Sequence, residues 1–416
     1  MAKGNIEGFD DAVAAAEALD DGLFHMTPKH VFSTQNNPMC GITLPQWTSV
    51  LWTHGRLIEW RYVPRAVFLT FSSIFTGLLG LIEVLWYPYY VIDAEPLPED
   101  PVFIIGHPRT GTTLLHNLLA ADTRTFYHCT TFCAGFPSCF LWFERWGKWL
   151  FSGAIAPTRP MDSMPLHFDL PQEDECATTV LSHGASYYLA LAFMAQETRF
   201  RKFLTLAAED GATPADEARW TSAFLFLVKK LTLRGRLQAP DAPRRRLLLK
   251  SPIHTARVPL LRKLFPKASF IYLHRDPYKV LQSSAHMADT AFWYIYLNTP
   301  TDAQVTEYTL WQFERMWAVY NQSATGSATT GADRSVSADI LEVPYADLVT
   351  QPMDVLQRIY THAGVEWSPA VVATFKGEVA ALAGYKVNSF VELPPALRSE
   401  IQRRAAGYFR AFGYPQ

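Results

Sequence analysis

The sequence predicts an α/β fold in which helices cover both faces of a parallel sheet, giving three layers. Three stretches support this prediction, because in each an apolar, strand-like run alternates with a helix-like pattern. They are residues 101–120, 247–287 and 338–364. Strands that alternate with helices along a chain usually pair in parallel, and ligands bind at the carboxyl ends of such strands. We therefore look for the functional residues at those ends.

The first 95 residues are expected to form a helical, aromatic-rich region that packs on the main domain (96–416) or on a membrane. The Pro-punctuated stretch DAEPLPEDP ends this region. Within it, residues 66–82 carry no charge. They favour a helix buried against the main domain, since the run contains Ser and Thr and is at the lower limit for crossing a bilayer. A spanning helix stays open, as does membrane contact by a helix lying on a lipid surface, helped by Trp52, Trp60, Trp86, Tyr87 and Tyr89.

The remaining elements follow in chain order. A strand is expected at 102–105 and a helix at 112–121, whereas 123–175 is rich in Pro, Phe, Trp and Cys and is predicted to form loops that wall a pocket. Helical patterns return at 176–206, and the low-complexity stretch 321–337 is predicted to be an exposed, mobile loop. Apolar residues that recur at helical spacing and are expected in the core are Trp220, Phe224, Leu227, Val228 and Leu231.

Composition limits the function. The 416 residues carry a net charge of −2 with a pI of about 6.6, which gives no electrostatic support for a nucleic-acid partner. Five cysteines are too few for a disulfide scaffold and, with no secretory signal expected at the start, indicate the cytoplasm. No metal is expected, because the one candidate cluster lacks paired C-x-x-C spacing. That cluster is His128, Cys129, Cys133 and Cys139.

The stretch PVFIIGHPRTGTTLLHNLLA (101–120) has the strand, glycine turn and helix of a phosphate-binding loop. Gly106 and Gly111 have the separation of G-x-x-x-x-G-K-[ST], but Thr112 and Thr113 follow, so the lysine of that motif is missing. Backbone N–H groups, the helix dipole and one arginine still suit a compact anion without a metal. The residues expected to bind it are Arg109, Thr110, Gly111, Thr112 and Thr113.

A second anion site is predicted one strand further along. Arg275 ends the strand in FIYLHRDPYKVLQSS, and Ser283 lies in the following helix. An arginine at a strand end can form a bidentate contact with phosphate, and a helical hydroxyl can add to it. Two anion sites at successive strand ends indicate a ligand with two separated phosphate groups.

Four segments, in this order, resemble sulfotransferases that use 3′-phosphoadenosine-5′-phosphosulfate (PAPS), in the branch with a P-R-[ST]-G-T-T loop. They are GHPRTGTTLLHNLLAAD, RPMDSMPLHFDLPQEDE, LLLKSPIHTARVPLLRKLFP and HRDPYKVLQSS, and the resemblance spans about 101–350. It implies a P-loop-like sulfotransferase fold with PAPS as co-substrate and no metal. PAPS has no β- or γ-phosphate, which accounts for the missing lysine.

The resemblance also implies roles for individual residues. Residues 109–113 would hold the 5′-phosphosulfate, and Arg275 with Ser283 would hold the 3′-phosphate. Lys250 would bridge the leaving phosphate and the departing sulfuryl group, with Arg109 neutralising charge beside it. Lys386 in AGYKVNSF is a further candidate phosphate contact.

The general base is less clearly marked. Related enzymes often carry a Glu about twenty residues beyond the loop arginine, but TFYHCTTFCAGF contains no acid. The base is therefore expected in PLHFDLPQEDE, with Glu173 ahead of Asp174 and His167. His254, four residues past Lys250, is the other candidate.

The acceptor is expected to be a hydroxyl or amine of an apolar small molecule or lipid, such as a sterol or phenol. Aromatic segments FPSCFLWFERWGKWLF and AFWYIYL flank the motifs and suit an apolar pocket, and a polysaccharide would require a basic groove. Two other functions stay open: a P-loop-type nucleotide kinase, and a non-catalytic, membrane-associated nucleotide-binding protein. The sequence makes no prediction of oligomeric state.

Overall fold

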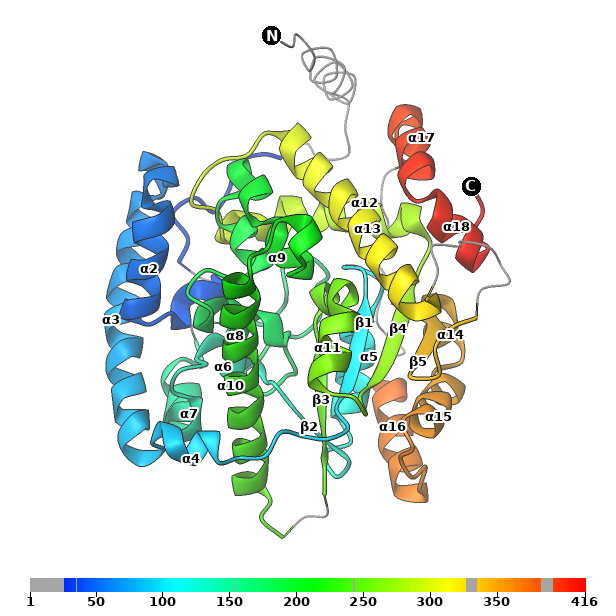
Figure 1. Cartoon of the computed structure of the whole chain (residues 1–416), viewed down its shortest axis with the longest axis horizontal. Helices are drawn as coiled ribbons and strands as arrows, with labels where there is room; N and C mark the ends of the chain where they lie inside the picture. The colour runs from blue at the N-terminus through cyan, green and yellow to red at the C-terminus, as the bar shows by residue number, and fades with distance from the viewer. Residues whose placement is uncertain (1–25, 35, 154, 242–243, 327–334, 383–391) are drawn as a thin grey trace.

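The computed structural model describes residues 26–34, 36–153, 155–241, 244–326, 335–382 and 392–416. In this part of the chain, one five-stranded sheet has the order β2-β3-β1-β4-β5, with every neighbouring pair parallel (Figure 1). The α/β parallel sheet predicted from the sequence is confirmed. The strands are β1 (Val102–Gly106), β2 (Phe126–His128), β3 (Arg246–Lys250), β4 (Ser269–His274) and β5 (Ile340–Pro344).

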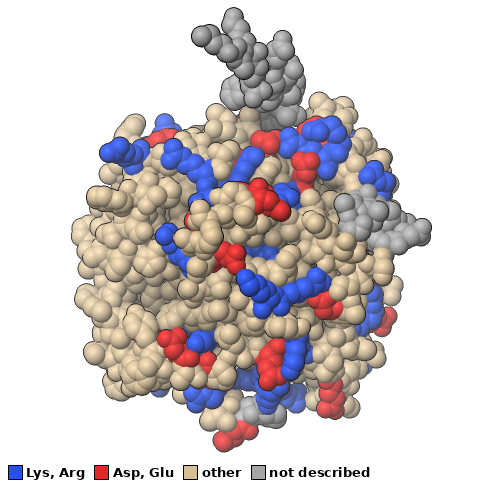
Figure 2. Space-filling model, viewed as in Figure 1, with Lys and Arg blue, Asp and Glu red and all other residues tan. Residues whose placement is uncertain are grey.

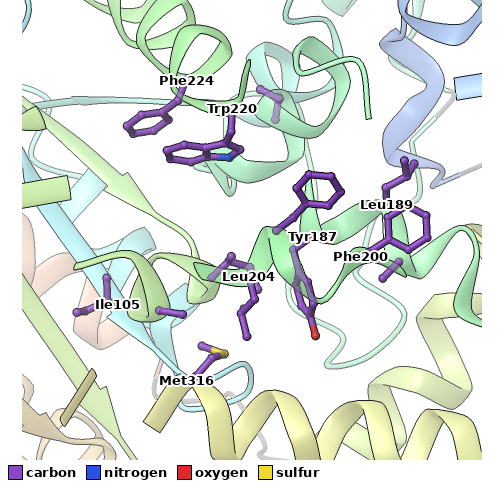
Figure 3. Packing of buried hydrophobic residues seen from close by; sticks show 14 of the residues in the cluster. Ile105, Tyr187, Leu189, Phe200, Leu204, Trp220, Phe224 and Met316 are labelled. Atoms are coloured by element: carbon purple, nitrogen blue, oxygen red, sulfur yellow. The ribbon is translucent and has the colours of Figure 1, made fainter. Parts of the chain in front are cut away.

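Helices cover both faces of the sheet, because alternate residues of its buried strands point to opposite sides. Ile104 shares one apolar cluster with residues of α5 (Thr112–Ala120), α15 (Pro352–His362) and α16 (Pro369–Ala381). Ile105 belongs to the other cluster, with Trp220 and Phe224 of α10 (Pro214–Gln238) and Met316 of α13 (Asp302–Thr325), as Figure 3 shows. The three predicted layers are therefore present.

The other helices are α2 (Leu44–His54), α3 (Val63–Trp86), α4 (Tyr89–Asp93), α6 (Thr131–Gly135), α7 (Phe140–Leu150), α8 (Asp174–Leu181), α9 (Lys202–Thr205), α11 (Val258–Leu264), α12 (Pro277–Ala291), α14 (Tyr345–Thr350), α17 (Pro395–Arg404) and α18 (Ala406–Phe412). Among them, α2, α3, α4 and α7 lie to one side of the sheet (Figure 1). Short 3-10 helices include η1 (Pro38–Gly41), η4 (Tyr187–Leu191) and η7 (Pro252–Arg257).

Two predictions of irregular structure are partly wrong. The stretch 123–175 contains β2, α6 and α7, and the first two are too short to give a detectable period. The stretch 321–337 was expected to be a loop, but α13 continues to Thr325 and buries Asn321. Helix α13 also carries Thr and Ser whose hydroxyls bond back to the preceding turn, so a polar sequence does not end the helix there. Residues 327–334 lie outside the described residues.

The N-terminal helices contact the rest of the chain at several places: α3 packs on α7, α4 on α10, and η1 on α6 and α8, with α3 at the edge of the molecule (Figure 1). The inner side of α3 makes polar contacts: Arg65 donates to the Tyr296 carbonyl of the main domain at 2.5 Å, and Thr76 donates to the Ile42 carbonyl of the N-terminal region at 2.5 Å. Near its other end, Glu83 accepts from Lys230, and both side chains are buried. The helix does pack on the main domain, along a buried side that mixes these polar residues with Leu69 and Leu79, and large apolar residues on its other side face outward.

Candidate active site at the carboxyl ends of β1, β3 and β4

The loop between β1 and α5 has a backbone that only certain residues allow. Gly106 and Gly111 have φ of 142° and 96°, and a Cβ at Gly111 would lie 2.4 Å from Cδ2 of Tyr345. Arg109 also has a left-handed φ of 71°, which indicates a strained, fixed turn. The N–H and hydroxyl of Thr110 both donate to the carbonyl of His107. These contacts hold the loop against the N-terminus of α5, where first-turn N–H groups lack helical partners.

Lys250 and Glu173 meet beside this helix end. Lys250 ends β3, and its Nζ lies 2.8 Å from Oε1 of Glu173 and 3.4 Å from Oγ1 of Thr113 in α5. Its side chain is only 1% exposed, whereas that of Glu173 is 19% exposed. Tyr188 donates to Oε2 of Glu173 at 2.5 Å. The predicted catalytic lysine and the preferred candidate base are therefore in direct contact at the start of α5.

The protonation state of Glu173 follows from these contacts. Burial acts to raise the pKa of its carboxyl, but the charge and hydrogen bond of Lys250, with the hydrogen bond from Tyr188, outweigh it. The pKa of Glu173 therefore lies below its usual value. In the protein without substrates, Glu173 is an ionised carboxylate paired with an ammonium group.

Asp174 and His254 lie behind this pair. Oδ2 of Asp174 is 2.5 Å from Nε2 of His254, and both side chains are fully buried. Oδ1 of Asp174 accepts the backbone N–H of Lys250 at 3.1 Å. The two side chains thus connect the first residue of α8 to the end of β3.

The two predicted anion sites adjoin each other. Nε of Arg109 donates to Oγ of Ser283 at 2.9 Å, and Nη1 of Arg275 donates to the carbonyl of Arg109 at 3.2 Å. The guanidinium of Arg275 lies over the ring of Tyr345, 4.4 Å from its centre, and the hydroxyl of Tyr408 accepts the Arg275 N–H at 3.1 Å. Arg109, Ser283 and Arg275 therefore form one continuous group at the ends of β1 and β4.

Comparison with known proteins identifies this arrangement. Residues 101–369 match the model of the sulfotransferase family. The chain belongs to the sulfotransferase family. It is therefore a transferase that moves a sulfuryl group, and the family match decides against the nucleotide kinase considered above.

Individual relatives agree with this assignment. The chain is 28% identical over 394 residues to proteins of Mycobacterium bovis and Mycobacterium tuberculosis named omega-hydroxy-beta-dihydromenaquinone-9 sulfotransferase Stf3, covering 89% of this chain and 92% of theirs. Its fold is similar to that of sulfotransferase STF1 from Mycobacterium tuberculosis H37Rv, with a TM-score of 0.59 and 18% identity, covering 96% of this chain and 98% of that one. It is also similar to that of sulfotransferase STF9 from Mycobacterium avium, with a TM-score of 0.57 and 18% identity, covering 98% of this chain and 97% of that one.

The structure adds two charged residues to the candidate site that the sequence analysis missed. Nη1 of Arg159 donates to Oγ1 of Thr113 at 3.1 Å, and its Nε lies 3.3 Å from Oδ1 of Asp162. The other oxygen of Asp162 lies 3.0 Å from Nη1 of Arg109. Both residues belong to the segment RPMDSMP. The sequence feature that could have indicated them is an Arg and an Asp three residues apart in this segment.

Other predicted residues of the sulfotransferase lie elsewhere. The side chain of His167 is exposed, and none of the hydrogen bonds of the described residues connects it to Lys250 or Glu173. Lys386 lies outside the described residues. In the described ranges no three His, Cys, Asp or Glu side chains converge as a metal site. The side chains of the segment AFWYIYL are mainly buried in the core: Phe292, Trp293, Tyr296 and Leu297.

Proposed function

We propose that this sulfotransferase transfers the sulfuryl group of PAPS to the hydroxyl of a lipid-like acceptor. The contact of Lys250 with both Glu173 and Thr113, at the N-terminus of α5, is the observation that supports it most strongly. It puts a cation, a candidate base and an anion-binding helix end within one hydrogen-bonded group. The lipid-like acceptor is suggested by the relatives, which are named as sulfotransferases of a menaquinone derivative.

The residues present suit the two anionic ends of PAPS. The N–H groups at the start of α5, with Arg109, Thr113 and Lys250, would hold the phosphosulfate. Arg275 and Ser283 would hold the 3′-phosphate, which the adjacency of both side chains to Arg109 supports. The helix dipole favours negative charge at the start of α5. PAPS supplies the sulfuryl group and a good leaving group, adenosine 3′,5′-bisphosphate.

The transfer itself needs charge neutralisation and proton removal. The acceptor oxygen forms a bond to sulfur as the bond from sulfur to the bridging oxygen breaks, and the electron pair of that bond stays on the departing phosphate. Lys250 lies where its ammonium can neutralise that phosphate, and the carboxylate of Glu173 takes the acceptor proton. A loose transition state, by analogy with phosphoryl transfer, leaves most of the catalysis to positioning.

The Lys250–Glu173 pair couples these two roles. In the protein without substrates, Lys250 keeps the pKa of Glu173 low, which makes the carboxylate a weak base. When the ammonium turns toward the phosphosulfate, Glu173 loses its main neutralising partner while its burial persists. Burial then raises the pKa of Glu173, and the base becomes stronger once both substrates are in place.

Asp174 and His254 act as positioning residues in this proposal. They are fully buried, so neither can contact an acceptor, but Asp174 holds the backbone of Lys250. Asp162 has a different role, because its carboxylate lies between Arg109 and Arg159 where an anionic ligand would also be attracted. The carboxylate of Asp162 therefore competes with PAPS for binding to Arg109.

The proposal is tested by supplying labelled PAPS to the purified protein with separate acceptor panels. The panels are isoprenoid and quinol lipids with a free hydroxyl, sterols, simple phenols, and polysaccharides, and products are identified by mass spectrometry. We expect sulfated lipid and adenosine 3′,5′-bisphosphate in equal amounts. Labelled polysaccharide, with every lipid and phenol unmodified, would contradict the proposed lipid-like acceptor. Thermal stabilisation by Mg·ATP but not by adenosine 3′,5′-bisphosphate would contradict PAPS as the sulfuryl donor.

A further inference from the structure

Helix α3 differs from an ordinary surface helix, whose apolar side packs inward and whose outer side is polar. The buried side carries four polar residues, Arg65, Ser73, Thr76 and Glu83, together with two apolar ones, Leu69 and Leu79. The exposed side carries large apolar residues along the whole length of the helix. They include Val67 (47% exposed), Phe71 (69%), Leu78 (57%), Leu81 (65%) and Leu85 (80%). We call this exposed side, with the neighbouring exposed residues of α7, the outer face.

The outer face is bordered by aromatic side chains. Trp60, 82% exposed, precedes α3, and Trp86, 73% exposed, ends it. Helix α7 packs beside α3 and exposes Trp146 (62%) and Trp149 (76%). Large aromatic side chains are usually buried, so four exposed Trp beside an exposed aliphatic helix side differ from the scattered single apolar residues of an ordinary surface. Trp at the borders of an aliphatic surface is the distribution found at membrane–water interfaces.

The outer face is also free of exposed charge along α3. Between Val63 and Trp86 the charged residues are Arg65 and Glu83, and both are buried. Figure 2 shows the corresponding left side of the molecule almost entirely tan, with charged residues above and below it. Exposed cations lie next to it in the sequence: Arg56 before α3 and Arg145 beside Trp146 in α7.

We propose that the outer face docks on the surface of a lipid bilayer, with α3 parallel to the membrane plane. Apolar side chains would enter the acyl region, Trp would lie at headgroup level, and Arg56 and Arg145 would favour anionic lipids. Crossing the bilayer is a poorer fit even though the length and composition of 60–86 allow it. A spanning α3 would have to separate Glu83 from Lys230 and Arg65 from the Tyr296 carbonyl.

The outer face lies one layer away from the candidate active site. Both η1 and α6 pack against α8, whose N-cap residue is Glu173, and η1 also packs against α3. A protein docked through the outer face would therefore hold its candidate base near the membrane. The docking proposal does not depend on the acceptor proposed above, because vesicle binding is measured without donor or acceptor.

The test is co-sedimentation of the full chain with vesicles of phosphatidylcholine, with and without phosphatidylglycerol, using a matched pair of double variants. Leu78→Gln with Leu85→Gln alters the outer face, while Leu237→Gln with Val349→Gln alters exposed apolar residues elsewhere (47% and 49%). We expect wild type and the control pair to bind, with a shift of Trp fluorescence to shorter wavelength. The outer-face pair should bind roughly tenfold or more weakly, because two apolar side chains lose their insertion.

Two outcomes would overturn the proposal. One is equal binding of both double variants, which would mean that lipid contacts another surface. The other is a wild type that ignores vesicles of either composition and forms dimers by analytical ultracentrifugation that the outer-face pair does not form. A second copy of the chain would then cover this surface. Turnover on a water-soluble acceptor should be the same for both double variants, so failure of docking is distinguishable from failure of the proposed chemistry.

Discussion

The loop at the start of α5 and the outer face of α3 are suited to very different ligands. The loop forms a small site, in which a few charged and hydroxyl groups would bind the ligand. These groups, such as Arg109, Thr113 and Lys250, are largely shielded from solvent. The outer face is broad, exposed and apolar, with no charged side chain directed outward along α3. At the loop, loss of one charged side chain removes a large part of the binding free energy for an anion. On the outer face, the binding free energy for lipid is distributed over many apolar side chains.

This difference orders the expected effects of substitution. Single changes at the loop should abolish or sharply reduce chemistry and leave vesicle binding intact. Changes on the outer face should need to be combined before they matter, and should leave chemistry on soluble acceptors intact.

Lys250→Ala should lower kcat about a thousandfold or more while the affinity for adenosine 3′,5′-bisphosphate changes little, because its charge is needed most in the transition state. Single-turnover assays and isothermal titration measure the two quantities. Lys267→Ala is the control, since that side chain is 71% exposed at the surface. Equal losses in affinity and turnover would contradict the role of Lys250, and a loss of vesicle binding would contradict the independence of the two regions.

Glu173→Gln should lower kcat by a factor of about 10²–10⁴, the range typical of a lost general base. Asp169→Asn, at a side chain 69% exposed, is the control. Wild-type turnover in the variant would assign the base to another residue.

The same variant gives a pH dependence of stability. The pKa of Glu173 is lower in the folded protein than its reference value of 4.5, so its ionisation stabilises the fold above that value. This contribution is lost as pH falls through the folded pKa. The difference in unfolding free energy between wild type and Glu173→Gln should be largest near neutral pH and shrink below pH 4.5. A difference in unfolding free energy that grows on acidification would show that folding raises the pKa of Glu173 instead of lowering it.

Arg275→Ala should weaken binding of adenosine 3′,5′-bisphosphate by roughly 2–3 kcal/mol, the range for a lost hydrogen bond to a charged group. Isothermal titration measures it, with Arg236→Ala, 60% exposed, as the control. An unchanged dissociation constant would mean that the 3′-phosphate is bound elsewhere.

Asp162→Asn should strengthen donor binding by a factor of roughly two to ten, because it removes a carboxylate that competes for Arg109. Glu209→Gln, at a side chain 70% exposed, is the control. Weaker binding in Asp162→Asn would show that the carboxylate orients Arg109 rather than competing with the ligand.

The smallest effect is expected for metal removal. Turnover in excess chelator should equal turnover without it, since the cationic side chains at the loop supply the charge that Mg²⁺ supplies to nucleotide kinases. Activity lost in chelator and restored by Mg²⁺ or Zn²⁺ would contradict a metal-free reaction.

The sequence predicts the loop well because its signals are local. Gly106, Arg109 and Gly111 follow a strand and open a helix, and this order leaves few conformations for the backbone. Arg275 and Ser283 could be placed for the same reason. Arg159 and Asp162 come from an irregular segment without periodicity, so only the folded chain brings them to Thr113.

The outer face could not be inferred from its own residues, because an apolar run is compatible with a buried, a spanning or a surface helix. The choice depends on what the polar side of α3 contacts: Tyr296 and Lys230 are distant in the sequence. Likewise, Tyr187 and Tyr188 of η4 carry no motif, yet the hydroxyl of Tyr188 is a direct partner of Glu173.

Arg65 and Glu83 have a consequence for the orientation of the whole molecule. They are separated by 18 residues, which is about five helical turns, so both point to the same side of α3. Each is bound to the main domain near one end of the helix. Together they prevent α3 from rotating about its own axis, and the angle between the outer face and the sheet is therefore fixed. A protein docked in this way would meet a membrane in a single orientation, with the height of its active site above the lipid determined by the fold.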